Sequence, residues 1–353
     1  MKNTRLLLLL LILGTLNLSA QNPVIYTRPS QLAKVFQRIG TTDIEVVYHA
    51  PLVKERKIFG GIVRYDEKID GKNHPWRAGA NENTTITFSH DVEINGQPMS
   101  SGNYGFHIFV SQKEWILTFS NRSEDWGSFT YTDTEDALRV SVKPQSVKMQ
   151  DWLSYHFSNP KQNEATLNLT WETTRVSFDI TTDVDRNILT DLEKVEDKTA
   201  GQLYAAASIT LKRDSSMTEE AMKLVNESIE LKKSLSNSLL KAELLRIGGN
   251  KKEAKKLKNS AIDSATANEI FSYAMKLNNE GDIKESLKLL NLNLEKNPEH
   301  WFTHLGFANY YMTRDEHAIS IPYFEKTLEF APEKGKGFAR YRLGFAKSQL
   351  KNE

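Results

Sequence analysis

The spacing of apolar residues changes along the chain, and this change restricts the possible folds more than any other feature. From about Ile44 to Ile180, apolar and polar residues alternate with the period of two that is typical of β-strands. After Asp183 the period becomes that of α-helices, in segments rich in Ala, Leu, Lys and Glu. We therefore expect an antiparallel β-sandwich domain over residues 21–185 and a helical domain over residues 190–353.

Turn signals divide the first half into short strands. Asn95-Gly96 follows Val92 and Ile94 and predicts a tight hairpin, because both turn residues tolerate positive φ. Many short strands with turns between them indicate a sandwich or barrel. The expected strands are Ile44–Tyr48, Tyr104–Val110, Trp115–Phe119, Arg139–Lys143, Tyr155–Phe157, Thr166–Trp171 and Arg175–Ile180.

Glycines mark the ends of helices in the second half. Gly248-Gly249 and Gly281 each follow a helical segment, at the position where a left-handed C-cap is favoured. The expected helices include Leu203–Leu211, Thr218–Lys233, Ser238–Ile247, Lys251–Ser264 and Ile270–Asn279.

The first twenty residues have the order of a secretory signal peptide. Lys2 and Arg5 precede the apolar run Leu6–Leu13, and Ala20 is the expected last residue of the peptide. No later segment is apolar enough to suggest a transmembrane helix, so we expect no integral membrane segment after cleavage. The chain has no cysteine, which excludes a lipoprotein anchor. We expect an exported protein, either periplasmic or secreted.

The overall charge gives no reason to expect a nucleic-acid partner. The chain has 46 Lys and Arg residues against 45 Asp and Glu residues, for a formal net charge of +1. A near-neutral chain has no general attraction to a polyanion.

The helical segments repeat with an offset of about 32 residues. Gly249 and Ala254 recur as Gly281 and Ser286, and a further 32 residues lead from Ser286 to Ala318. The unit Ile270–Pro298, with weaker copies at Leu203–Leu231 and Trp301–Pro332 and a capping helix at Gly337–Leu350, resembles the tetratricopeptide repeat. This resemblance implies a concave face that binds a protein partner.

Two stretches of the sheet half also resemble a known family. Tyr48–Val63 and Trp76–Val110 contain the pairs Lys54 and Arg56, Gly60-Gly61, and Trp76-Arg77, followed by Gly79-Ala80-Asn81-Glu82. They resemble the secreted proteins called domain of unknown function 2911, which occur largely in Bacteroidetes, over about Val24–Thr182. The resemblance implies the fold and the export, but no reaction.

Polar residues that could bind a ligand are most concentrated between residues 73 and 89. Arginine offers a planar fork for a carboxylate or for sugar hydroxyls. The alternative is that Arg77 pairs with Glu82 and fixes a turn, with Gly79 and Asn81 supplying its geometry. The candidate ligand-binding residues are Arg56, Arg77, Asn81, Glu82, His49 and His107.

Catalysis and metal binding have weaker support in the sequence. No HExxH pattern and no GxSxG elbow is present, and His300 and His304 have no third ligand nearby. We therefore assign no catalytic residue, no metal and no cofactor. The sequence favours an exported, non-catalytic binding or scaffold protein that takes a glycan or small polar ligand. The alternative is a carbohydrate or ester hydrolase in which Glu82 acts with His49 or His107.

Overall fold

A computed structural model describes residues 27–350 of the chain, so the predicted signal peptide lies outside the described residues. The described residues form two compact units, which divide between Val184 and Asp185. Within the described part, no helix is both long enough and apolar enough to cross a membrane.

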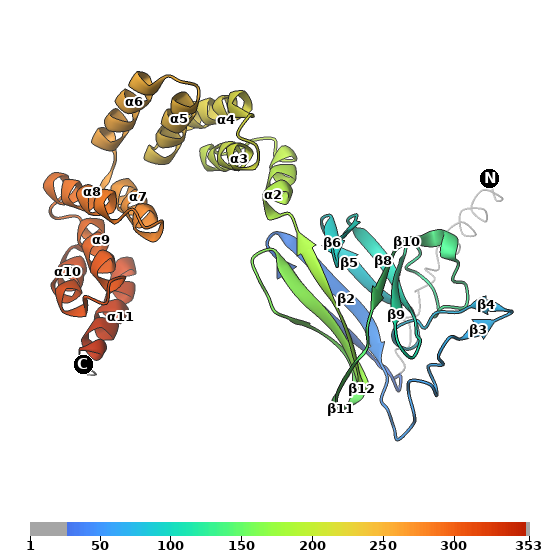
Figure 1. Ribbon diagram of the computed structural model, residues 1–353. Helices are drawn as coiled ribbons and strands as arrows, with labels where there is room; N and C mark the ends of the chain where they lie inside the picture. The colour runs from blue at the N-terminus through green and yellow to red at the C-terminus, as the bar shows by residue number, and fades with distance from the viewer. Residues whose placement is uncertain (1–26, 351–353) are drawn as a thin grey trace, which may run out of the picture. The chain divides into compact units, whose positions relative to one another are not determined.

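The first unit contains two larger antiparallel sheets and a small hairpin (Figure 1). The six-stranded sheet has the order β1-β2-β5-β8-β9-β10, and the four-stranded sheet has the order β11-β12-β6-β7. The strands of the first sheet are β1 (Gln31–Ile39), β2 (Thr42–Ala50), β5 (Thr84–Phe88), β8 (Gly102–Phe109), β9 (Trp115–Ser120) and β10 (Asp136–Val142). Those of the second are β6 (Val92–Ile94), β7 (Gln97–Met99), β11 (Gln145–Ser158) and β12 (Glu164–Thr182), and β3 (Lys68–Ile69) pairs with β4 (Lys72–Asn73).

The two larger sheets bury one core between them. Alternate residues of β2 and β5 are buried, as the period of two predicts. Aromatic rings join the sheets: Phe106 of β8 and Phe119 of β9 each lie 5.9 Å from Phe178 of β12, between ring centroids. Tyr48 of β2 and Tyr155 of β11 meet edge to face at 4.7 Å. The predicted antiparallel β-sandwich is confirmed.

Two strand predictions need correction. The edge strand β1 was not predicted, because Leu32 and Phe36 point to solvent and obscure the apolar alternation. The two strands predicted at Thr166–Trp171 and Arg175–Ile180 form one strand, β12. Glu172 within β12 has φ +54°, and the register with β11 shifts around it. The sequence analysis therefore predicted a break between two strands here, whereas the irregularity interrupts only the pairing and the strand continues.

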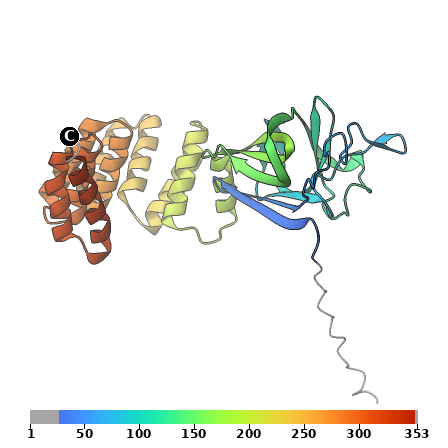
Figure 2. The ribbon, with the colours of Figure 1, turned by 90° about the horizontal axis from the view of Figure 1, so that it is seen from below.

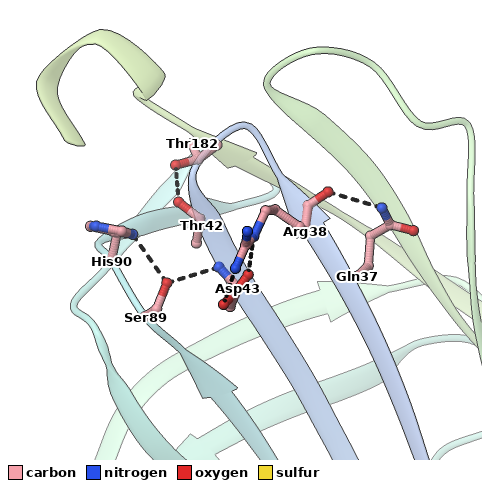
Figure 3. A network of polar contacts seen from close by, with 7 residues as sticks. All are labelled: Gln37, Arg38, Thr42, Asp43, Ser89, His90 and Thr182. Carbon is pink, nitrogen blue, oxygen red and sulfur yellow. Dashed lines mark hydrogen bonds and ion pairs between the residues drawn. The ribbon is translucent and has the colours of Figure 1, made fainter. Parts of the chain in front are cut away.

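A polar network ties the β1–β2 hairpin to the ends of two other strands (Figure 3). The hydroxyls of Thr42 and Thr182 lie 2.7 Å apart in the interior, which links the hairpin to the end of β12. Arg38 donates two hydrogen bonds to Asp43 across the hairpin, and the backbone N–H of Asp43 donates to the Ser89 hydroxyl. The network joins the two sheets at the end of β12 that contains Thr182.

The second unit consists of helices that pack as successive antiparallel pairs (Figures 1 and 2). The described helices are α2 (Val184–Glu193), α3 (Ala200–Arg213), α4 (Thr218–Leu231), α5 (Leu235–Ile247), α6 (Lys251–Ser264), α7 (Ala267–Asn279), α8 (Ile283–Lys296), α9 (Trp301–Met312), α10 (His317–Phe330) and α11 (Glu333–Gln349). Short turns join α3 to α4, α5 to α6, α7 to α8 and α9 to α10. The predicted helical repeat architecture is confirmed.

The turns inside three pairs have the same left-handed cap. Gly249 and Gly281 both have φ +86°, as predicted, and Asp315 takes the equivalent place with φ +58°. The next residue in each turn donates its N–H to a carbonyl five residues earlier, as Asp282 does to Leu277. Ser320 follows Asp315 by five residues and is fully buried, as Ser286 is after Gly281. The prediction that Ala318 takes the place of Ser286 in the next unit is wrong. Ala318 is exposed, because the spacing to this unit is two residues longer than 32 and Ser320 takes that place.

We expect opposite effects from adding one methyl group at two open glycines. Neither Gly281 nor Gly344 has an atom within 4 Å of an added Cβ, so the substitutions differ only in backbone preference. Gly281→Ala forces alanine into positive φ and should destabilise the protein by about 1 kcal/mol. Gly344→Ala lies inside α11 and should be neutral or stabilise by up to about 1 kcal/mol. Urea unfolding measures both, and a stabilising Gly281→Ala would contradict the cap assignment.

Candidate functional site

Residues 77–83 form a loop that leaves the six-stranded sheet and returns to it at the neighbouring position. Trp76 pairs with Ile108 of β8 through two backbone hydrogen bonds of 2.8 Å. Thr84, the first residue of β5, pairs with Phe106 of the same strand. Because Phe106 and Ile108 are two residues apart, a regular strand would need a single residue between their partners. The remaining residues of the loop must leave the plane of the sheet.

Hydrogen bonds to backbone carbonyls hold this loop in one conformation. The carbonyl of Ala78, a fully buried residue with φ +53°, accepts from the hydroxyls of Thr84 at 3.1 Å and Tyr155 at 2.8 Å. The indole N–H of Trp76 donates to the carbonyl of Gly79 at 3.1 Å. A Cβ on Gly79 would lie 2.7 Å from the Thr84 hydroxyl, so only glycine fits there. The loop is therefore a fixed part of the domain and does not depend on a ligand for its shape.

Arg77 is a partly buried cation without a carboxylate partner. Its Nη1 donates to the carbonyl of Asn81 at 2.5 Å, and its guanidinium lies 5.4 Å from the centre of the Phe129 ring. It forms no ion pair with any residue between 27 and 350. The backbone of Gly127 packs directly against the guanidinium, since a Cβ there would lie 2.3 Å from Cζ. Burial lowers the pKa of Arg77, which reflects the unfavourable desolvation of this charge.

Glu82 pairs with a residue other than Arg77. Arg28 Nη1 lies 2.6 and 2.7 Å from the two carboxylate oxygens of Glu82, and His49 Nδ1 lies 3.4 Å from one of them. Burial raises the pKa of Glu82, but hydrogen bonds from Arg28 and from its own backbone outweigh burial and leave the pKa below its ordinary value. The pairing of Arg77 with Glu82, which the sequence left open as an alternative, is therefore absent.

A cleft of about 460 Å³ lies beside this loop in the sheet domain. Trp76 and Trp171 stack in its wall with ring centroids 5.8 Å apart, and Phe129, which is 68% exposed, stands at its edge. Three cations line it, Lys54, Arg56 and Arg77, together with His74 and the single carboxylate of Glu67. The cleft therefore combines aromatic surface with a net positive charge, a composition suited to an anion that carries an apolar face.

The structure distributes the predicted site residues over four places. Arg56 and Arg77 both line the cleft, although Arg56 also donates to the carbonyls of Val53 and Leu52. Asn81 lies in the loop with φ +59° and donates to the Ser30 carbonyl. Glu82 and His49 form a separate pair with Arg28. His107 is buried under the loop that contains Ser128, to whose hydroxyl its Nδ1 lies at 3.0 Å.

The Glu82–His49 pair has the wrong protonation preferences for a general acid. A catalytic acid needs a carboxyl whose pKa is raised toward the working pH, whereas the pKa of Glu82 is lowered. Burial lowers the pKa of His49, and the Arg28 charge lowers it further, although Glu82 acts in the opposite direction. This arrangement suits a structural ion pair better than proton transfer. Within residues 27–350, no three His, Asp or Glu side chains converge on a possible metal position.

Three residues near the site were not found by sequence reasoning. Phe129 and Trp171 line the cleft, and Arg28 forms an ion pair with Glu82. Trp171 lies in β12, almost a hundred positions from Trp76, and only the packing of the two sheets brings them together. The sequence offered only a weak local signal for Phe129, an aromatic residue two positions after Gly127.

A second hollow lies in the helical unit, with a volume of about 640 Å³. The first helices of three successive pairs, α3, α5 and α7, line it, together with α6. Tyr204, Leu239, Leu240 and Tyr273 supply apolar surface. The charged residues that line it are the cations Arg246, Lys251, Lys255, Lys258 and Lys276 and the single acid Glu243. We call this hollow the basic groove.

His107 makes the stability of the sheet domain depend on pH. Burial lowers its pKa from 6.5 to about 4, so the unfolded chain binds the proton at a higher pH than the folded chain. Its contribution is therefore complete above pH 6.5 and is lost as the pH falls toward 4. Between pH 7.5 and pH 5, the wild type should lose about 2 kcal/mol more unfolding free energy than His107→Gln.

Urea unfolding at the two pH values measures this difference. His90→Gln, which replaces a partly exposed histidine, is the control and should behave as the wild type. An equal pH dependence in wild type and His107→Gln would show that His107 is not buried in its neutral form.

No curated protein matches the chain. Among solved structures, the APC/C hetero-tetramer Cut9-Hcn1 is similar at 17% identity and a TM-score of 0.28, over 47% of this chain and 33% of that chain. YrrB, a TPR protein with an unusual peptide-binding site, is similar at 16% identity and a TM-score of 0.25, over 46% of this chain and 84% of that one. This chain thus spans about a third of the Cut9-Hcn1 chain.

The family comparison covers the sheet domain and the loop that borders its cleft. Residues 30–180 match the model of the family described as "Protein of unknown function (DUF2911)". The resemblance predicted from Tyr48–Val63 and Trp76–Val110 is confirmed: residues 30–180 match DUF2911, and the successive helix pairs expected from the repeat pattern follow them.

Proposed function

We propose that the protein is an exported, non-catalytic binding and scaffold protein of the bacterial envelope. Its helical repeats dock a protein segment, and its sheet domain binds a small polar ligand or glycan. The charged, apolar and small-residue order of residues 1–20 supports export. The basic groove supports the protein-binding role most strongly.

The composition of the basic groove indicates the kind of segment that it binds. Lys251 and Lys255 form no ion pair with a described residue, whereas Arg246 pairs with Glu243. Cations at the rim attract an acidic segment and set its register, and the apolar surface between them accommodates side chains of that segment. The proposed partner is therefore an extended acidic protein segment with interspersed apolar residues.

A hydrolase remains the second candidate, on the single observation that His49 lies 3.4 Å from Glu82. The contact of Arg28 Nη1 with both carboxylate oxygens of Glu82 favours the binding role, because it engages the carboxylate that a hydrolase would need.

Peptide display against the full chain tests the proposed docking. Selected peptides should be enriched in Asp and Glu, and a labelled acidic peptide from the selection should lose affinity as salt rises. Reversing two charges of the basic groove, with Lys255→Glu and Lys258→Glu, should weaken this peptide by about tenfold or more, since each reversal replaces attraction by repulsion. Fluorescence anisotropy measures the affinity.

Lys223→Glu supplies the matched control, because Lys223 is an exposed lysine of α4 that does not line the groove. This variant should bind the peptide as the wild type does. Selection of basic or neutral peptides, or equal loss of affinity in the control, would refute the acidic segment.

A further inference from the structure

The guanidinium of Arg77 has an incomplete set of partners. Of its five N–H groups, one hydrogen bond is made to a residue of the described chain, that from Nη1 to the Asn81 carbonyl. A partly buried cation is ordinarily paired with an anion, because desolvation of an isolated charge is unfavourable. The carboxylates of the same region are engaged elsewhere: Glu82 contacts Arg28, and Glu67 lies 4.0 Å from Arg64. Arg77 therefore lines the cleft without a carboxylate partner among the described residues.

Two other cations of the cleft also have no ion-pair partner among the described residues. Lys54 and Arg56 form no ion pair with a described residue, and both line the cleft. Arg56 is held by the carbonyls of Val53 and Leu52, which fixes its position without neutralising its charge. The three cations therefore give the cleft a positive wall, in which Arg56 and Arg77 are held by backbone carbonyls.

The cleft also has an exposed aromatic surface. Phe129 is 68% exposed, with the Arg77 guanidinium 5.4 Å from its ring centre and His74 6.3 Å away. Trp76 contributes a second ring, which Trp171 supports from behind by stacking. Flat apolar surfaces of this kind favour a ring-shaped ligand over a small inorganic anion, since a ring buries apolar area that a small ion lacks.

A buried donor in the cleft wall is also unsatisfied. Trp171 is 3% exposed, and its indole N–H has no hydrogen-bond partner within the described residues. Leaving such a donor unpaired is unfavourable. Because Trp171 lines the cleft, a ligand oxygen that reaches this N–H would satisfy it.

From these observations we propose that the cleft binds a carboxylate carried on a ring, with the carboxylate on Arg77 and the ring against Phe129 and Trp76. The proposal rests on the proposed ligand-binding role of the sheet domain and names the ligand class. Two sources share this chemistry: sugar acids of the uronate type, whose hydroxyls can also accept from Trp171, and aromatic acids.

Saturation-transfer NMR titrations with the full chain separate these possibilities. The probes are D-glucuronate, benzoate, D-glucose, acetate and inorganic phosphate. Glucuronate or benzoate should bind more tightly than both glucose, which lacks the carboxylate, and acetate, which lacks the ring. Arg77→Met should weaken the bound acid about tenfold or more, because a charge-assisted bidentate contact is lost. Arg77→Lys should give an intermediate loss, since lysine retains the charge without the fork.

Two further variants separate binding from folding. Phe129→Ser alters an exposed side chain and should weaken the ring-bearing acid without lowering the melting temperature. Lys113→Gln removes an exposed cation of the same domain that does not line the cleft, and it should bind as the wild type does.

The outcomes distinguish this proposal from the broader one. If glucose and glucuronate bind with equal affinity and both lose affinity in Phe129→Ser, the ligand needs no carboxylate. That result would overturn the proposed carboxylate recognition but would still support ligand binding by the sheet domain. If phosphate binds more tightly than both acids, the proposed preference for a ring-bearing ligand is overturned. Failure of both acids to bind the folded wild type would overturn the proposal, and the failure of glucose as well would extend that result to the proposed ligand-binding role.

Discussion

The shape of the sheet domain near the cleft depends on two residues of β8 that lie two positions apart. Ile108 pairs with Trp76 and Phe106 pairs with Thr84, so the residues between Trp76 and Thr84 cannot remain in the sheet. The loop that results is held by the Ala78 carbonyl, which joins β5 to the opposite sheet through Tyr155. This constraint places Arg77 beside Phe129 and at the wall of the cleft. The same loop is thus both a part of the architecture and the support of a candidate site.

The helical unit depends on a different local constraint. Each turn inside the three pairs α5–α6, α7–α8 and α9–α10 requires one residue with positive φ, followed by a small buried residue five positions later. Small residues such as Ser286 allow the helices of a pair to approach closely, and the Ser286 hydroxyl donates to the Ala274 carbonyl. Repetition of this unit places α3, α5 and α7 side by side and aligns the cations of the basic groove.

Features fixed by local sequence were predictable, and features that depend on distant contacts were not. The hairpin at Asn95-Gly96 and the cap at Gly281 follow from residues that tolerate positive φ, and both are present. Asp315 occupies the same cap without glycine, which explains the wrong register at Ala318. In the site, Arg56 and Arg77 were found from the types of their side chains. The Arg28–Glu82 contact and the Trp76–Trp171 stack each join residues more than fifty positions apart, so no local pattern reports them.

The central claim is that the Arg77 cleft is built for an anion on a ring. A crystal structure of the full chain grown with 4-bromobenzoate tests it most directly, because the anomalous signal of bromine locates the ring independently of the protein. The account predicts a bromine position in the cleft next to Phe129, with the carboxylate within hydrogen-bonding distance of the Arg77 guanidinium. An empty cleft, with Arg77 instead paired to a carboxylate of the protein, would contradict it.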